Sequence, residues 1–136
     1  MVRSLLVIDL FQKVIDWSQN KFIPMGNILS ADKRCERRQG DFFKLARTGF
    51  DLFDHNRKFD AVLLDIDHSP EHFLARENKS FYGAEELKLL REQIKAGGRF
   101  ALWSNDPADE KFTKHLESVF GTAVAHNIEF ANPYTN

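Results

Sequence analysis

Apolar runs and amphipathic stretches alternate along the chain, and this pattern predicts a succession of strands and helices. Residues 4–9 form a short apolar run that ends in an acid, "SLLVID", which is typical of a buried strand. Residues 10–22 carry apolar side chains at helical spacing, and Pro24 and Gly26 interrupt that spacing. The first two elements are therefore expected to be a strand and a helix.

The same order continues to the end of the chain. A short strand is expected at residues 34–38, and Asp41 stands where an acid caps the following helix. The strongest strand pattern is at residues 59–66, "FDAVLLDI". Gly97 and Gly98 are expected to cap the end of a later helix. The remaining elements are a helix at 84–98, a strand at 99–104, a helix at 107–121 and a strand at 122–132.

This alternation is typical of an α/β domain with a mostly parallel sheet, helices on both faces and right-handed crossovers. One domain spanning residues 1–136 is expected, because the length suits a single core. Ligands of such sheets bind beyond the carboxyl ends of the strands. The polar residues expected at these ends are Asp9, Asp65, Asp67 and Ser104.

Composition narrows the classes of function. The formal net charge is -1, so no basic excess points to a nucleic-acid partner. Cys35 is the only cysteine, which leaves no disulfide framework and favours the cytoplasm. The apolar part of the N-terminal stretch is too short and too charged for a signal peptide or a membrane span. Pro70 between His68 and His72 disfavours a helical turn there, so no metal site is expected.

Several segments, in this order, resemble the spermidine synthase-like branch of the S-adenosylmethionine-dependent methyltransferase superfamily. They are "VIDLFQKVIDW", "GDFF", "FDAVLLDIDHSP", "FY", "KAGGRFALWS" and "IEFANP". The resemblance covers nearly the whole chain, and its specificity lies in the order and spacing of these segments. It implies an incomplete Rossmann-like fold of the class I methyltransferase type, with S-adenosylmethionine or decarboxylated S-adenosylmethionine as cofactor.

The resemblance also implies roles for individual residues. Asp9 matches the acid that holds the ribose hydroxyls of the nucleoside, and Asp41 matches the acid that accepts from the adenine amino group. Asp65 matches the carboxylate that orients the attacking amine. Asp67 and His68 complete the expected catalytic set. The expected substrate contacts are Tyr82, an aromatic near the cleft, and Ser104, at a strand end.

The chain also departs from the family pattern. His68 stands where the synthases carry a second acid, and G-x-G-x-x-G occurs nowhere in the sequence. Met1 is followed almost at once by the strand that matches the family's second strand, so the chain is expected to be truncated at its N-terminus. The missing strand is normally central. We expect strands 4–9 and 59–66 to close up and pair directly; filling of the gap by a second copy, or a fragment of partial stability, are the alternatives.

The function expected is that of an S-adenosylmethionine-dependent methyltransferase or spermidine synthase-like domain with weak or no catalytic activity. Whether the chain is an enzyme is left open, because the cofactor loop is missing. The alternative is a non-catalytic module, derived from the same fold, that forms oligomers or binds a protein. A homodimer is expected in either case, because a reduced sheet leaves apolar surface exposed.

Overall fold

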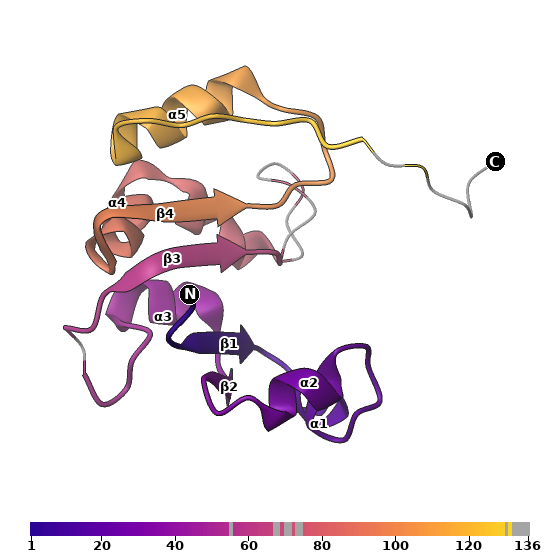
Figure 1. The fold of residues 1–136 in the computed structure, drawn as a ribbon. Coiled ribbons are helices and arrows are strands. Elements are labelled where there is room, and N and C mark those ends of the chain that lie inside the picture. The colour runs from indigo at the N-terminus through magenta and orange to yellow at the C-terminus, as the bar shows by residue number, and fades with distance from the viewer. Residues whose placement is uncertain (55, 67–68, 70–71, 73–74, 130, 132–136) are drawn as a thin grey trace. The chain divides into compact units, whose positions relative to one another are not determined.

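The computed structural model describes residues 1–54, 56–66, 69, 72, 75–129 and 131. These residues divide into two compact units, Met1–His55 and Asn56–Asn136, and each is described by itself. Each unit contains helices and one parallel sheet (Figure 1). The α/β class with parallel strands is therefore confirmed. A Rossmann-like sheet is not confirmed, because each sheet has two strands within the described ranges. The assignment of one domain to residues 1–136 stays a prediction.

The first unit is built around one parallel strand pair. The elements are β1 (Leu5–Asp9), α1 (Gln12–Gln19), α2 (Gly26–Ala31), β2 (Cys35–Gln39) and α3 (Phe42–Thr48). β1 and β2 pair in register from Leu5 opposite Cys35 to Asp9 opposite Gln39. A tight turn cannot join two parallel strands, so α1 and α2 form the crossover between them.

Close packing explains the glycine between α1 and α2, and other local contacts hold the chain around β2. A Cβ at Gly26 would lie 2.5 Å from the carbonyl oxygen of Ser18, so glycine is required where α2 meets the end of α1. At the entrance to β2, Arg34 binds the carboxylate of Asp32 at 2.6 Å. This side-chain hydrogen bond lowers the pKa of Asp32 to about 2. Further along, Phe42 at the start of α3 packs on Phe50, with ring centroids 5.3 Å apart.

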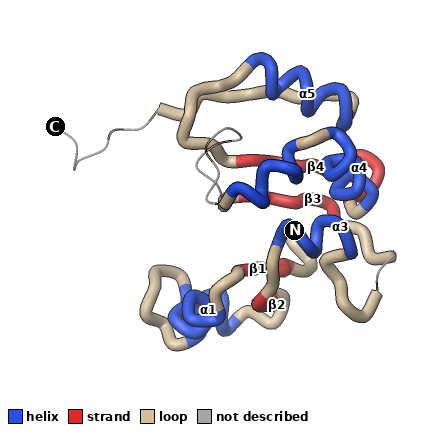
Figure 2. The backbone as a smooth tube through the Cα atoms, turned by 180° about the vertical axis from the view of Figure 1, so that it is seen from behind, coloured by secondary structure: helices blue, strands red, loops and turns tan. Residues whose placement is uncertain are grey.

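The second unit is built around the other parallel pair. Its elements are β3 (Phe59–Leu64), the 3-10 helix η1 (Arg76–Tyr82), α4 (Ala84–Glu92), β4 (Ile94–Leu102) and α5 (Glu110–Phe120). α4 covers one face of this sheet, seen from opposite sides in Figures 1 and 2. Leu87 and Leu90 of α4 are fully buried, and Val62 and Leu64 of β3 are buried as well. Burial of a side chain of this size stabilises the fold by about 1.5–3 kcal/mol, so these four side chains are a main part of the core of the unit.

The opposite face of the same sheet is open. Side chains alternate along a strand, so Leu63 points away from its buried neighbours Val62 and Leu64. Leu63 is 74% exposed. Within this unit the described helices cover the Val62 and Leu64 side of β3, so the expectation of helices on both faces is not confirmed.

Strand pairing is described inside each unit: β1 pairs with β2, and β3 pairs with β4. The predicted pairing of strands 4–9 and 59–66 would join the two units and stays a prediction. A buried-looking apolar run identifies a strand but carries no information on which edge it joins. Residues 122–129 form no strand in the part of the chain that is described. Ala108 donates its N–H to the side chain of Asn127 at 2.9 Å, so this segment lies against the start of the α5 region.

Gly97 and Gly98 do not cap a helix, and the prediction that they do is wrong. α4 ends at Glu92, and Ile94 already pairs with Phe59 at the start of β4. The register then jumps, because Ala61 pairs with Arg99. Residues 95–98 therefore bulge out of the ladder, and Gly97 has the positive φ of 75° that glycine adopts at such bulges.

Every helix within the described ranges is too short or too polar to cross a membrane.

We predict that Gly98→Ala destabilises the second unit by about 1–3 kcal/mol. An added Cβ would lie 2.5 Å from the Ile94 side chain and 2.8 Å from the carbonyl oxygen of Asp60. The control is Gly97→Asn, because a Cβ there meets nothing within 4 Å and asparagine tolerates a positive φ. Hydrogen exchange of the β3 and β4 amides measures both changes. Equal protection in the two variants would contradict the packing argument.

Candidate functional site

Polar residues predicted from the sequence lie at the carboxyl ends of both strand pairs. Asp9 is the last residue of β1, and Asp41 follows β2 by two residues. Asp65 follows β3 directly, and Ser104 lies two residues beyond β4. Each pair thus shares the end of one parallel sheet, which is where such sheets bind ligands. Asp67 and His68 lie outside the described residues.

Asp9 combines a local structural contact with an available oxygen. Its Oδ1 accepts the N–H of Phe11 at 2.8 Å, which turns the chain from β1 into α1. Its backbone carbonyl accepts the N–H of Gly40 at 2.9 Å, which ties the segment before Asp41 to the end of β1. Oδ2 makes no hydrogen bond with any residue that the structure describes. That oxygen is available to a ligand hydroxyl.

Asp41 is the N-cap of α3, as expected from the sequence. Its Oδ1 accepts the N–H groups of Phe43 at 3.0 Å and of Lys44 at 3.3 Å. Its Oδ2 lies 3.6 Å from the Lys44 ammonium, a weak ion pair on a half-buried carboxylate. The capping role accounts for one oxygen of Asp41, so a ligand would have to compete with Lys44 for the other.

In the second unit, Asp65 and Ser104 share the carboxyl end of the sheet. The N–H of Trp103 donates to the carbonyl of Leu64 at 3.0 Å, so the parallel pairing continues to the point where both strands end. Asp65 is exposed and forms no hydrogen bond or ion pair with any described residue. An unpaired, solvated carboxylate at this position is suited to attract a cation or to accept from an amine.

A cluster beside Ser104 was not identified from the sequence. The Ser104 hydroxyl accepts the N–H of Asp106 at 3.1 Å. The Asp106 carboxylate in turn lies 3.1 Å from Nδ1 of His72, and the same nitrogen lies 3.1 Å from Oγ of Ser69. These contacts join the segment after β3 to the segment after β4. They hold His72 near the carboxyl end of the β3–β4 pair.

The cluster is not a nucleophilic triad. A Ser-His-Asp relay uses the two different ring nitrogens of histidine, whereas Ser69 and Asp106 both contact Nδ1 of His72. Ser69 is also 3% exposed, so a substrate cannot reach its hydroxyl. Nε2 of His72 forms no hydrogen bond or ion pair with a described residue, and the side chain is 70% exposed. The ring is therefore held through one nitrogen and presents the other to solvent or to a ligand.

Tyr82 lies in the core of the second unit. It is 8% exposed, and its ring packs edge-on against Phe81 and Phe112 with centroids 5.2 Å and 6.0 Å away. Its carbonyl oxygen lies 3.0 Å from Nε2 of His115. The substrate role of Tyr82 stays a prediction, and its packing accounts for an aromatic residue at this position.

The signal for part of the His72 cluster was present in the sequence. A serine followed by proline, as in Ser69-Pro70, is typical of a capped turn, and Oγ of Ser69 does accept the N–H of His72 at 3.1 Å. The contact between His72 and Asp106 spans 34 residues, and no local sequence pattern predicts it. Asp106 could be found only from the fold.

Comparison with protein-family models, with curated proteins and with solved structures found no match. The fold and the two sheet ends define an α/β protein with carboxylates at the carboxyl ends of both parallel strand pairs. These features, together with the His72 cluster, are the observations on which a functional proposal must depend.

We predict that Asp41→Ala destabilises the start of α3 by about 1 kcal/mol, because the N–H groups of Phe43 and Lys44 lose their acceptor. Asp41→Ser keeps a capping oxygen, so it should destabilise the start of α3 by only a few tenths of a kcal/mol. Amide hydrogen exchange at Phe43 and Lys44 measures the effect. Unchanged exchange in the alanine variant would show that the cap contributes nothing.

Proposed function

We propose that the chain is an S-adenosylmethionine-binding domain of the methyltransferase and spermidine synthase-like type, with weak or no catalytic activity. The observation that supports this most directly is the end of the β1–β2 pair. There Asp9 has one oxygen committed to the turn and one oxygen without a partner among the described residues. Asp41 follows the neighbouring strand at the same end.

The chemistry of the nucleoside suits this arrangement. A ribose presents two adjacent hydroxyl donors, and a carboxylate at the end of a parallel strand accepts from such a pair in dinucleotide sites. In this proposal Asp9 accepts from the ribose, and Asp41 accepts from the adenine amino group. S-Adenosylmethionine and its decarboxylated form share this nucleoside, so the same contacts serve either cofactor.

Asp65 is the proposed contact for the acceptor substrate, with Ser104 beside it. Its exposed carboxylate, which no described residue neutralises, is suited to orient an amine by accepting its proton or its hydrogen bond. Residues 1–136 contain no G-x-G-x-x-G segment to approach the methionine part of the cofactor, so we propose weak activity for these residues by themselves. His68 in place of a second acid also removes charge that would bind a polyamine.

We predict a dissociation constant for S-adenosylmethionine no tighter than the high micromolar range, about -5 to -6 kcal/mol, measured by titration calorimetry. Asp9→Asn should weaken binding of S-adenosylmethionine and of 5′-methylthioadenosine by about tenfold, because asparagine keeps one acceptor for Phe11 but lacks the second carboxylate oxygen.

The matched control is Asp16→Asn, which changes a carboxylate in the middle of α1 that accepts from Gln12 and does not terminate a strand. It should bind both nucleosides as the unchanged protein does. No heat of binding with either nucleoside would refute the proposal. A submicromolar constant would instead contradict the weak binding inferred from the missing loop.

The alternative function, a non-catalytic oligomerising module, is favoured by a different observation. Leu63 is 74% exposed in the middle of β3, on a sheet face where parallel sheets ordinarily carry a helical layer. Ala61 and Ala101 are exposed on the same face, so Leu63 has apolar neighbours there, with the exposed Arg99 beside Ala61. Such a surface is suited to self-association about a two-fold axis.

We predict a dimer at micromolar concentration that Leu63→Lys converts to a monomer, as measured by sedimentation equilibrium. A symmetric dimer loses two buried leucines, which corresponds to more than a tenfold change in the dissociation constant. Val124→Lys is the control, because Val124 is also exposed but lies outside the sheet. A monomeric parent protein at about 100 µM would refute self-association.

A further inference from the structure

The second unit contains a half-open pocket, called the cavity below, away from the carboxyl end of its sheet. Its volume is about 580 Å³, within the range of small-molecule sites, which is roughly 300–1,000 Å³. Its lining comes from the residue before β3, the C-terminal half of α4, the first residues of β4 and the last residue of α5. The cavity therefore lies at the amino end of the β3–β4 pair, opposite the end that carries Asp65 and Ser104.

The cavity is strongly basic. Among the residues that the structure describes, the charged ones in the lining are the cations Lys58, Lys88, Arg91 and Lys95 and one carboxylate, Glu92. Four cations against one carboxylate give the lining a net charge of +3. The whole chain carries a formal net charge of -1, so this excess is a local feature and not a consequence of a basic protein.

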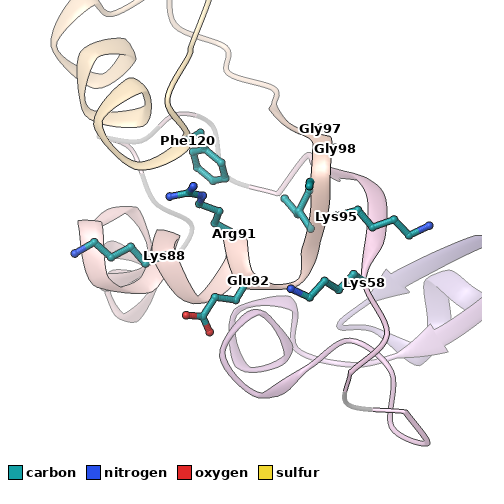
Figure 3. Close-up of a pocket in the computed structure, with 10 residues that line it drawn as sticks. Lys58, Lys88, Arg91, Glu92, Lys95, Gly97, Gly98 and Phe120 are labelled. Carbon is teal, nitrogen blue, oxygen red and sulfur yellow. The ribbon is translucent and has the colours of Figure 1, made fainter.

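Two of these cations, Lys58 and Arg91, keep hydrogen-bond donors available for a ligand. Lys58 forms no hydrogen bond or ion pair with any described residue. Arg91 donates one N–H to the carbonyl of Val119 at 2.9 Å, which leaves most of its five donors for another acceptor. In Figure 3, Arg91 lies beside the Phe120 ring, the backbone of Gly97 and Gly98 lies across from it, and Lys58 and Glu92 lie at one end.

The other two cations point outward and are held by weak surface pairs. Lys88 pairs with Glu85 at 2.9 Å, and Lys95 pairs with Asp60 at 2.9 Å. Both partners are highly exposed carboxylates, and such pairs contribute little to stability. The two lysines extend away from one another in Figure 3. A ligand with more charge than one carboxylate would draw either lysine from its present partner.

The backbone opposite Arg91 leaves room for a ligand. Residues 95–98 have no partner in the register of β3, because Phe59 pairs with Ile94 and Ala61 with Arg99. Gly97 adds no side chain, and a Cβ there would meet nothing within 4 Å. Backbone amides at a bulge with a left-handed residue are a common element of anion sites. The C-terminal carbonyl groups of α4 and α5 carry partial negative charge and repel an anion. Arg91 reduces this repulsion at α5, because it donates a hydrogen bond to the carbonyl of Val119.

We propose that this cavity binds a small polyanion of the diphosphate class, held between Lys58 and Arg91 against the bulge at residues 95–98. A diphosphate has several charges and many acceptor oxygens, and guanidinium groups bind such oxygens in pairs. The free ion and a nucleoside diphosphate share this chemistry. The site is separate from the proposed nucleoside contacts of the first unit and does not depend on them.

The test is titration calorimetry of the full chain with inorganic pyrophosphate and with ADP at low ionic strength. Measurable binding of pyrophosphate supports the site, and binding of ADP that Lys58→Gln weakens as much as it weakens pyrophosphate binding shows that the cavity also takes a nucleoside diphosphate. Lys58→Gln should weaken pyrophosphate binding by about tenfold. Glu92→Gln removes the one carboxylate of the lining and should tighten binding by about threefold.

Lys114→Gln is the matched control, because Lys114 lies on α5, pairs with Glu110 at 2.6 Å and does not line the cavity. It should bind pyrophosphate within about twofold of the parent, whereas attraction by overall charge would weaken both lysine variants equally. Equal weakening in Lys58→Gln and Lys114→Gln would overturn the proposal. So would the absence of pyrophosphate and ADP binding tighter than about 1 mM.

Discussion

Parallel strand pairing through helical crossovers is the constraint on which both units depend. A tight turn cannot join parallel neighbours, so each pair is connected by helices: α1 and α2 between β1 and β2, and η1 and α4 between β3 and β4. In a parallel pair, both strands run in the same direction. The residues that follow the two strands therefore lie at the same end of the sheet, which places Asp65 and Ser104 at one end although they are far apart in sequence.

This polarity gives the second unit two chemically different ends. The carboxyl end carries the exposed carboxylates of Asp65 and Asp106 with the ring of His72. The amino end carries the basic cavity with Lys58 and Arg91. Cations and carboxylates placed at opposite ends of one sheet do not neutralise each other through contact, so each end keeps its own preference for a ligand.

Local structure and candidate chemistry share the same carboxylates in the first unit. Asp9 uses Oδ1 to accept the N–H of Phe11 in the turn before α1, and Asp41 uses Oδ1 to cap α3. A carboxylate has two oxygens and about four lone pairs, so a cap does not exhaust its capacity to accept. The cap also holds the second oxygen in a fixed direction. An acid that begins as a helix cap is thereby positioned to serve a ligand, and neither role excludes the other.

The sequence by itself determined the features that depend on near neighbours. Apolar runs located β1 and β3, and an acid before an amphipathic stretch identified Asp41 as the cap of α3, because these interactions span only a few residues. Only the tertiary structure decided which strands pair, that Gly97 lies in a bulge of β4, and that His72 meets Asp106. Hydrogen bonds between strands and contacts across 34 residues depend on where distant segments fold, and no local pattern records that position.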